Sequence, residues 1–176
     1  MTAPAMLADW RDEIFAALKA ADIRQVAYVP DAGHTRLINA CRDDQDIRTV
    51  SLTAEQEGIA LLAGAWLGGQ RGALLMQSSG VGNCVNMLSL AQECRFPLLM
   101  IVTMRGEWGE FNPWQLPMGQ ATTRTLEDAG VIVERVQTGD AIADTVFSAG
   151  TMAFSANRAI AVLISQRIIG FKDWSK

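Results

Sequence analysis

Residues 72–83 read GALLMQSSGVGN, an apolar run followed at once by a turn rich in serine and glycine. The run at 73–76 is apolar at every position, which is typical of a strand in a parallel sheet covered by helices on both faces. Gly80 and Gly82 then favour a tight turn into a helix, whose first backbone N–H groups can bind an anion or a polar ring. The segment therefore predicts an α/β sheet with either a simple turn or a binding site at this point.

The turn does not fit the two common nucleotide-binding patterns. Val85 stands where the third glycine of a GxGxxG motif would be, and no acidic residue ends the next apolar run at 98–103. The Lys-Ser/Thr pair of a phosphate-binding loop is also absent. A nucleotide-binding Rossmann-like protein is therefore the least favoured functional class.

Outward from this segment, short apolar runs alternate with longer amphipathic ones along the whole chain. Consecutive strands joined by helices predict right-handed crossovers and one three-layer α/β/α domain with a six-stranded, mainly parallel sheet. We expect strands at 25–29, 47–52, 73–77, 98–103, 131–136 and 159–164. We expect helices at 6–21, 35–41, 53–67, 83–94, 122–129 and 140–155. Ligands of such sheets bind at the carboxyl ends of the strands, which directs attention to the loops at 30–34, 53–57, 77–83 and 104–119.

Composition narrows the function classes. The 176 residues carry a net charge of −4 with no basic run, which argues against nucleic acid and anionic membranes as partners. No apolar run approaches the length of a membrane span. Three cysteines without CxxC spacing and a single histidine argue against a zinc site and a Ser/His/Asp triad, so no metal ligands are predicted. A reducing, cytoplasmic location fits this cysteine usage.

Two glutamates mark the start of the helix expected at 53–67. Thr53 and Gln56 have the spacing of a capping box. Acidic residues are common in a first turn because they meet the positive end of the helix dipole, and this alone would explain both Glu55 and Glu57. Two positions on a helix differ by roughly 200°, so at most one of the two glutamates faces a given site.

Two loops contain further candidates. The segment at 104–119 carries Arg105, Trp108, Trp114 and Gln115, and a loop this long in a compact domain is usually functional. It is predicted to be a lid or an interface segment. His34 follows the turn at 30–31, where a lone histidine is either a surface residue or a catalytic one.

Several of these segments resemble, in the same order, the pyrimidine-binding (PYR) domain of thiamine diphosphate enzymes. The order is Glu55, a helix glycine nine positions later at Gly64, the strand at 72–77 and the SSGVGN turn at 78–83. Within this family the chain resembles sulfopyruvate decarboxylase α subunits and phosphonopyruvate decarboxylases. They share its Val-Pro-Asp turn at 29–31 and an Arg-Gly-Glu type segment, which in this chain lies at 105–107.

The resemblance implies a role for one glutamate. Counting back from Gly64 identifies Glu55 as the carboxyl that hydrogen-bonds the aminopyrimidine ring and promotes loss of the thiazolium C2 proton. The cofactor then attacks a 2-oxo acid and accepts the electrons released with CO2. The turn residues implied to bind the cofactor are Ser79, Gly80, Val81, Gly82 and Asn83.

The resemblance also implies a missing half. In this family a second domain with Gly-Asp-Gly and a later Asn holds the diphosphate and Mg²⁺, and no Gly-Asp-Gly occurs in this chain. Residues 1–176 are therefore expected to be a single PYR domain that needs a diphosphate-binding β subunit in an α2β2 or larger hetero-oligomer. The residues expected at that interface are apolar and lie on the two helices next to the cofactor. They are Trp66, Leu67, Val85, Met87 and Leu88.

The substrate side departs from the family pattern. Ala32 stands where relatives have a polar residue after the aspartate, so His34 is expected to act in its place. Arg105 and Gln115 are the other residues expected to bind the substrate, a small 2-oxo acid. Few cations and several aromatic residues in this loop favour a less charged or more aromatic acid over sulfopyruvate. A carboligase subunit and a catalytically silent regulatory subunit are the alternatives.

Overall fold

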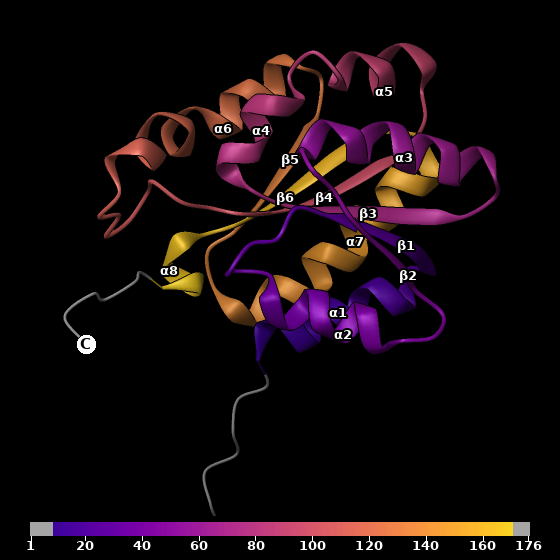
Figure 1. Ribbon diagram of the computed structural model, residues 1–176, viewed down its shortest axis with the longest axis horizontal. Coiled ribbons are helices and arrows are strands. Elements are labelled where there is room, and N and C mark those ends of the chain that lie inside the picture. The colour runs from indigo at the N-terminus through magenta and orange to yellow at the C-terminus, as the bar shows by residue number, and fades with distance from the viewer. Residues whose placement is uncertain (1–8, 171–176) are drawn as a thin grey trace, which may run out of the picture.

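The computed structural model describes residues 9–170, and its centre is a sheet of six strands (Figure 1). Neighbouring strands all pair in parallel, in the order β2-β1-β3-β4-β6-β5. The predicted α/β class and strand count are therefore confirmed. The strands are β1 (Ile23–Tyr28), β2 (Arg48–Ser51), β3 (Arg71–Gln77), β4 (Leu98–Thr103), β5 (Ile132–Val136) and β6 (Ala159–Ile164).

Helices cover both faces of the sheet, as Figure 1 shows. One layer contains α1 (Trp10–Ala20), α2 (Thr35–Asp43) and α7 (Ile142–Ala156), and the other contains α3 (Glu55–Leu67), α4 (Ser78–Cys84), α5 (Leu88–Cys94) and α6 (Leu116–Asp128). Successive residues of β3 point into different cores: Leu75 packs with the α1 and α7 side, whereas Leu74 and Met76 pack with the α3 side. Burial on both faces explains why this strand is apolar throughout. No helix within residues 9–170 is both long and apolar enough to cross a lipid bilayer.

The prediction of a capping box at the start of α3 is wrong. The helix begins at Glu55, and the side chain of its N-cap residue, Ala54, has no atom that can accept a capping hydrogen bond. Instead, the Oε2 atom of Glu57 accepts a hydrogen bond from the backbone N of Thr53 at 3.0 Å. Glu57 therefore satisfies the exposed backbone at the helix start, which is the structural use of an acidic residue in a first turn.

The prediction of a single helix at 83–94 is also wrong, because the segment forms two helices. The chain passes from β3 directly into α4 at Ser78, and α5 follows after a short turn at 85–87. Serine and glycine are poor helix formers, so propensity favoured a loop at this point, but Gly80 lets the first turn pack tightly against α3.

Several strand boundaries and the end of α2 differ from the expectation by one or two residues, and the starts of three helices differ as follows. α6 begins at Leu116 rather than at 122, after a short 3₁₀ helix (Pro113–Gln115) and with Pro117 in its first turn, where proline is tolerated. α1 begins at Trp10 after its N-cap Asp9, and the part expected at 6–8 lies outside the described residues. A second 3₁₀ turn (Gly139–Ala141) precedes α7, and α8 (Gln166–Ile169) follows β6.

Replacing Gly58 by alanine should destabilise the fold. A Cβ atom at Gly58 would lie 2.5 Å from Leu74 Cδ1 and 2.9 Å from Leu52 Cδ1, whereas one at Gly64 of the same helix would meet nothing within 4 Å. Both substitutions gain the same helix propensity, so their difference isolates the overpacking, about 1–3 kcal/mol. Urea unfolding of both variants measures it, and equal midpoints would show that the β3 side chains adjust without cost.

Candidate active site

A chain of hydrogen bonds runs along the carboxyl edge of the sheet. Asp31, just after β1, accepts one from Gln77 Nε2 at 2.9 Å and one from Thr103 Oγ1 at 2.6 Å. Ser79 extends the chain by donating to Gln77 Oε1 at 2.9 Å. The ends of β1, β3 and β4 are thus joined through side chains, and the carboxylate of Asp31 is fixed at their centre.

Glu55 lies beside this network at the first position of α3. Its residue exposure is only 8%, and its Oε2 atom accepts a hydrogen bond from Asn83 Nδ2 of α4 at 2.7 Å. Gly80 packs against the carboxylate so closely that a Cβ atom there would collide with Oε1. Glu55 also borders a pocket of about 130 Å³ with Pro30, Asp31 and other residues of the edge. The arrangement buries a carboxylate, holds one of its oxygens with Asn83, packs the other against Gly80, and leaves the side chain at the border of a pocket.

The two glutamates of α3 have separate surroundings, as their helical spacing predicts. Glu57 is exposed and bonds only the backbone of Thr53. Glu55 points toward α4 and the carboxyl edge. Of the two, Glu55 alone is in a position to contact a ligand of this edge.

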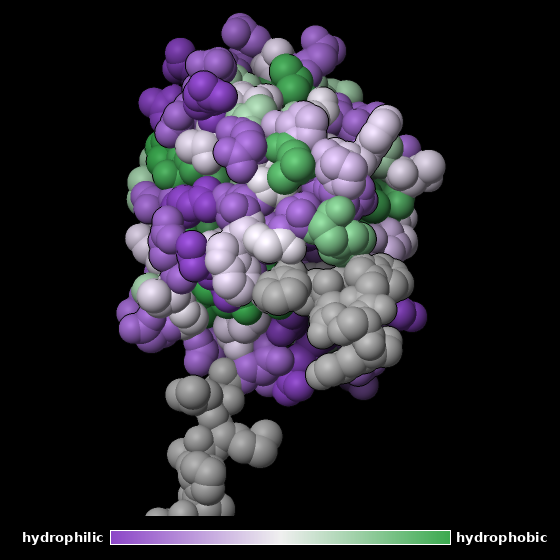
Figure 2. All heavy atoms as spheres, turned by 90° about the vertical axis from the view of Figure 1, so that its left-hand side faces the viewer, coloured by the Kyte–Doolittle hydropathy of each residue, from purple (hydrophilic) through white to green (hydrophobic). Residues whose placement is uncertain are grey.

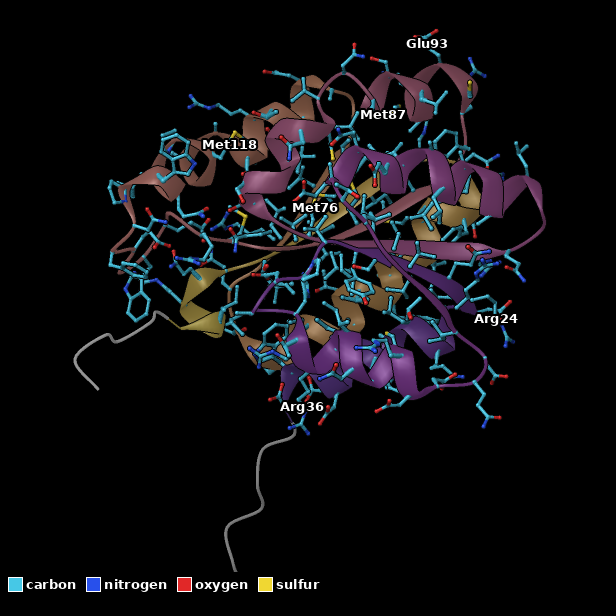
Figure 3. The ribbon with its side chains drawn as sticks, viewed as in Figure 1. Arg24, Arg36, Met76, Met87, Glu93 and Met118 are labelled. Carbon is cyan, nitrogen blue, oxygen red and sulfur yellow. The ribbon has the colours of Figure 1, made fainter. Side chains whose placement is uncertain are left out.

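The other expected cofactor residues divide into two groups. Gly80 and Asn83 contact Glu55 as described above, and Ser79, which donates to Gln77, borders the same pocket as Glu55. Val81 is fully buried in the core, so its side chain supports α4 from beneath. Gly82 faces α6, where Met118 Sδ would lie 3.4 Å from an added Cβ atom; Figure 3 shows Met118 between these helices.

A second cleft, of about 150 Å³, lies on the other side of Asp31. It is lined by Arg11, Thr103, Arg105 and the segments around Gly33 and Gly170. Asp31 borders both this cleft and the Glu55 pocket. Figure 2 looks at the side of the molecule that carries the β4–α6 loop and α8, where hydrophilic residues predominate and apolar ones are scattered. A ligand spanning both hollows would therefore contact Asp31 in its middle.

Arg105 is held by an ion pair. Its Nε and one terminal nitrogen each lie 2.6 Å from an oxygen of Glu110, whose side chain is 1% exposed. This hydrogen-bonded guanidinium lowers the pKa of Glu110 to about 2. Gln166 of α8 also donates to Glu110, at 2.9 Å, and accepts from the backbone N of Glu107 and Trp108. The loop after β4 is therefore fastened to α8.

The structure does not bring His34 to the surface of either hollow. The side chain is fully buried, and Nε2 lies 3.3 Å and 3.2 Å from the carbonyl oxygens of Met76 and Ile101. Burial lowers the pKa of His34 below its ordinary value, which favours the neutral ring. His34 thus braces β3 and β4 from within, an arrangement that does not fit contact with a substrate.

Gln115 lies close to Arg105 along the fold, because its backbone packs against Gly106. Its Oε1 atom is buried without a hydrogen-bond partner among residues 9–170. It does not line the cleft that Arg105 borders. Arg105 is therefore the one of the three expected substrate residues that reaches this cleft.

Sequence reasoning missed three side chains of the edge. Asp31 was treated only as part of a turn, and Thr103 and Arg11 were given no role at the site. The signal for Asp31 and Thr103 was their position, since each stands at or just after the carboxyl end of a strand. Arg11, which donates to the carbonyl of Gly33 at 2.7 Å, comes from a helix that is distant in the sequence and had no such signal.

The parallel sheet, the two helix layers and a buried carboxylate facing a glycine describe an α/β/α domain with a candidate site at the carboxyl edge of its sheet. Residues 9–114 match the family described as thiamine pyrophosphate enzyme, N-terminal TPP binding domain. The chain belongs to this family.

Two similar proteins and one solved structure are consistent with this family. The chain is 33% identical over 154 residues to sulfopyruvate decarboxylase subunit alpha of Methanococcus maripaludis, covering 87% of this chain and 92% of the relative. It is 39% identical over 117 residues to phosphonopyruvate decarboxylase of Streptomyces viridochromogenes, covering 65% of this chain but only 30% of that protein. A 2-oxoglutarate:ferredoxin oxidoreductase from Magnetococcus marinus superposes with a TM-score of 0.76 over 92% of this chain and 29% of that one, at 16% identity, and shows the same fold.

A buried carboxylate that borders a pocket is a chemically suitable partner for the ring of thiamine diphosphate. Asn83 donates to Oε2, and the carboxylate lies so close to Gly80 that it fills the place a Cβ atom would take. No group of three or more His, Cys, Asp or Glu side chains within residues 9–170 is arranged to hold a metal ion.

Proposed function

We propose that this chain is the α subunit of a heteromeric thiamine diphosphate-dependent 2-oxo-acid decarboxylase of the sulfopyruvate and phosphonopyruvate decarboxylase type. The single observation that carries the proposal is the buried Glu55 carboxylate, held by Asn83 and facing Gly80. The match to relatives supports it, because the chain spans nearly all of a protein named subunit alpha and about a third of a phosphonopyruvate decarboxylase.

Glu55 has the geometry to exchange a proton with the cofactor ring. Asn83 donates to Oε2, and Glu55 borders the small pocket at the carboxyl edge, so its carboxylate can hydrogen-bond a ring nitrogen placed there. When bound, thiamine diphosphate supplies the carbon nucleophile and the electron sink for loss of CO2. The buried position excludes water from the proton transfer, which strengthens its electrostatic control.

The substrate side is built by Asp31 and Arg105. Arg105 can hold the carboxylate of a 2-oxo acid in the second cleft through the guanidinium edge that faces away from Glu110. Asp31, between the two hollows, receives hydrogen bonds from Gln77 and Thr103 and can orient the reacting end of the substrate. We assign to Asp31 the contact expected of His34, and to Gln115 only a place on the adjacent turn.

The partner is a diphosphate-binding β subunit that carries Gly-Asp-Gly and a later Asn and holds Mg²⁺, in an α2β2 or larger assembly. The proposal is supported by relatives named subunit alpha, nearly all of whose length this chain covers, and by exposed apolar residues at the ends of α3 and α4. Leu67 is 86% exposed at the end of α3, and Val85 lies exposed after α4. Leu88 is core instead, and Trp66 is half-buried with its ring packed against Phe154, so these two contribute less.

The isolated chain should bind thiamine diphosphate only weakly. Its described residues contact one end of the cofactor, and the diphosphate with its Mg²⁺ needs hard oxygen ligands from the partner. Isothermal titration of the chain alone, and then of the co-expressed pair, measures the difference. Micromolar or tighter binding without a partner would contradict the proposed division of the site.

Product analysis of the co-expressed pair tests the reaction itself. Release of CO2 and of the corresponding aldehyde from a 2-oxo acid is the expected result. An acyloin as the main product would identify a carboligase instead. A pair that assembles but converts no 2-oxo acid would identify a regulatory subunit.

A further inference from the structure

We propose that Glu110 restricts this chain to 2-oxo acids whose only anionic group is the carboxylate, so that acids with a second anion, such as a sulfonate or phosphonate, are poor substrates. The inference rests on the proposed function and names the substrate class of that site. Glu110 acts as a positioning and specificity residue, because it reaches the substrate through Arg105.

The first support is the geometry of the ion pair. Two parallel hydrogen bonds of 2.6 Å join the guanidinium of Arg105 to Glu110. A bidentate pair of this kind satisfies one edge of the guanidinium and balances its charge. The opposite edge of the guanidinium makes no side-chain hydrogen bond within residues 9–170, so its N–H groups can donate to the carboxylate of one bound acid. The side chain therefore offers one binding edge and little net charge.

The second support is that Glu110 is locked in place. Its carboxylate also receives hydrogen bonds from Gln166 Nε2 at 2.9 Å and from the backbone N of Asn112 at 3.0 Å and Gly106 at 3.3 Å. The side chain is almost completely buried, and Gln166 is buried as well. Release of Glu110 would leave these donors without an acceptor, which opposes any movement that frees Arg105 for a second anion.

The third support is the charge balance around the cleft. Its other cation, Arg11, is paired with Asp9 at 3.2 Å and donates to the carbonyl of Gly33. Asp31 adds a carboxylate at the border of the cleft. A dianionic acid would thus bring a second negative charge to a place where both arginines already have carboxylate partners. Ile169 contributes an apolar wall, which suits an uncharged substituent instead.

The test compares two acids on the enzyme assembled with its partner subunit. For the wild-type enzyme we expect kcat/KM to be at least tenfold higher for 2-oxobutanoate than for sulfopyruvate. In E110Q the isosteric amide removes the negative charge, and the ratio should shift at least tenfold toward sulfopyruvate. The matched control is E127Q, which makes the same change at an exposed glutamate of α6. Glu127 does not line the cleft, so the ratio should stay within threefold of wild type.

The outcomes separate the two proposals. Turnover of neither acid by the wild-type pair would defeat the proposed function. A wild-type preference for sulfopyruvate, or an E110Q variant that alters both acids equally, would overturn the role of Glu110 while leaving the decarboxylase intact. Should E110Q fail to assemble, inhibition of the wild-type enzyme decides: butanoate should inhibit at least tenfold more strongly than 3-sulfopropanoate, and equal or reversed strength would overturn the inference.

Discussion

Replacement of Glu55 by glutamine should lower the turnover of the assembled enzyme by about 10²–10⁴-fold, the range typical of a proton-transferring group. Glutamine keeps the shape of the side chain and can still accept the hydrogen bond from Asn83. It cannot exchange a proton with a ring nitrogen. Steady-state rates with saturating cofactor and substrate measure the effect, and native gel or sedimentation analysis confirms that the variant assembles.

Glu57→Gln is the matched control, because the same change is made two residues further along the same helix. Glu57 bonds the backbone of Thr53 and is exposed, so its loss should cost less than tenfold in turnover. The expected stability change is about 0.3–1 kcal/mol, the value of a charge at a helix end. Similar losses of turnover in both variants would show that the glutamate was assigned to the wrong position.

Gly80→Ala should impair catalysis almost as strongly, although it removes no functional group. The added methyl would collide with the Glu55 carboxylate, and the carboxylate must then move. A displacement of about 1 Å at a reacting group can cost about 10²-fold. We expect a loss of this size in kcat/KM, measured on the pair, whereas Gly139→Ala, where an added Cβ meets nothing within 4 Å, should behave as wild type.

A double-mutant cycle separates this effect from general damage to the fold. If Gly80→Ala acts by displacing Glu55, it should have little further effect in an enzyme that already carries Glu55→Gln. Independent, multiplying losses would indicate that the methyl group disturbs cofactor binding or folding by another route.

The apolar runs predicted the sheet well because burial on both faces leaves a continuous signal. β4 and β6 lie where the sequence predicted them, at 98–103 and 159–164. The α4 helix was missed because serine and glycine resemble a loop when judged by propensity alone, and the packing that overrides propensity comes from Glu55 on another helix. Local patterns thus predicted the core and failed where contacts between distant segments decide the structure.

The candidate site shows the same division. Glu55 could be chosen over Glu57 from a resemblance and a helical spacing, both of which are properties of the sequence. The burial of His34 depends on which way a loop side chain turns, and no periodicity encodes that direction. Glu110 is a further case, since its partner Arg105 is five residues away but its lock comes from Gln166, 56 residues away.

Asp31 is the only described residue that borders both hollows, and this has a consequence for how such a protein diversifies. The side chain of Glu55 is held by Asn83 of α4, whereas the guanidinium of Arg105 is held by Glu110 of its own loop, which Gln166 of α8 fixes in turn. The backbone N of Arg105 donates to Ser78 of α4 at 3.0 Å, so the two sets of contacts meet at α4. Under the proposed function, a change of the Arg105 side-chain partners in the loop would alter which acids are accepted while Glu55 keeps its hydrogen bond from Asn83. The scaffold is modular in this sense, and an engineer seeking a new substrate range would vary the Arg105 loop while leaving α3 and α4 untouched.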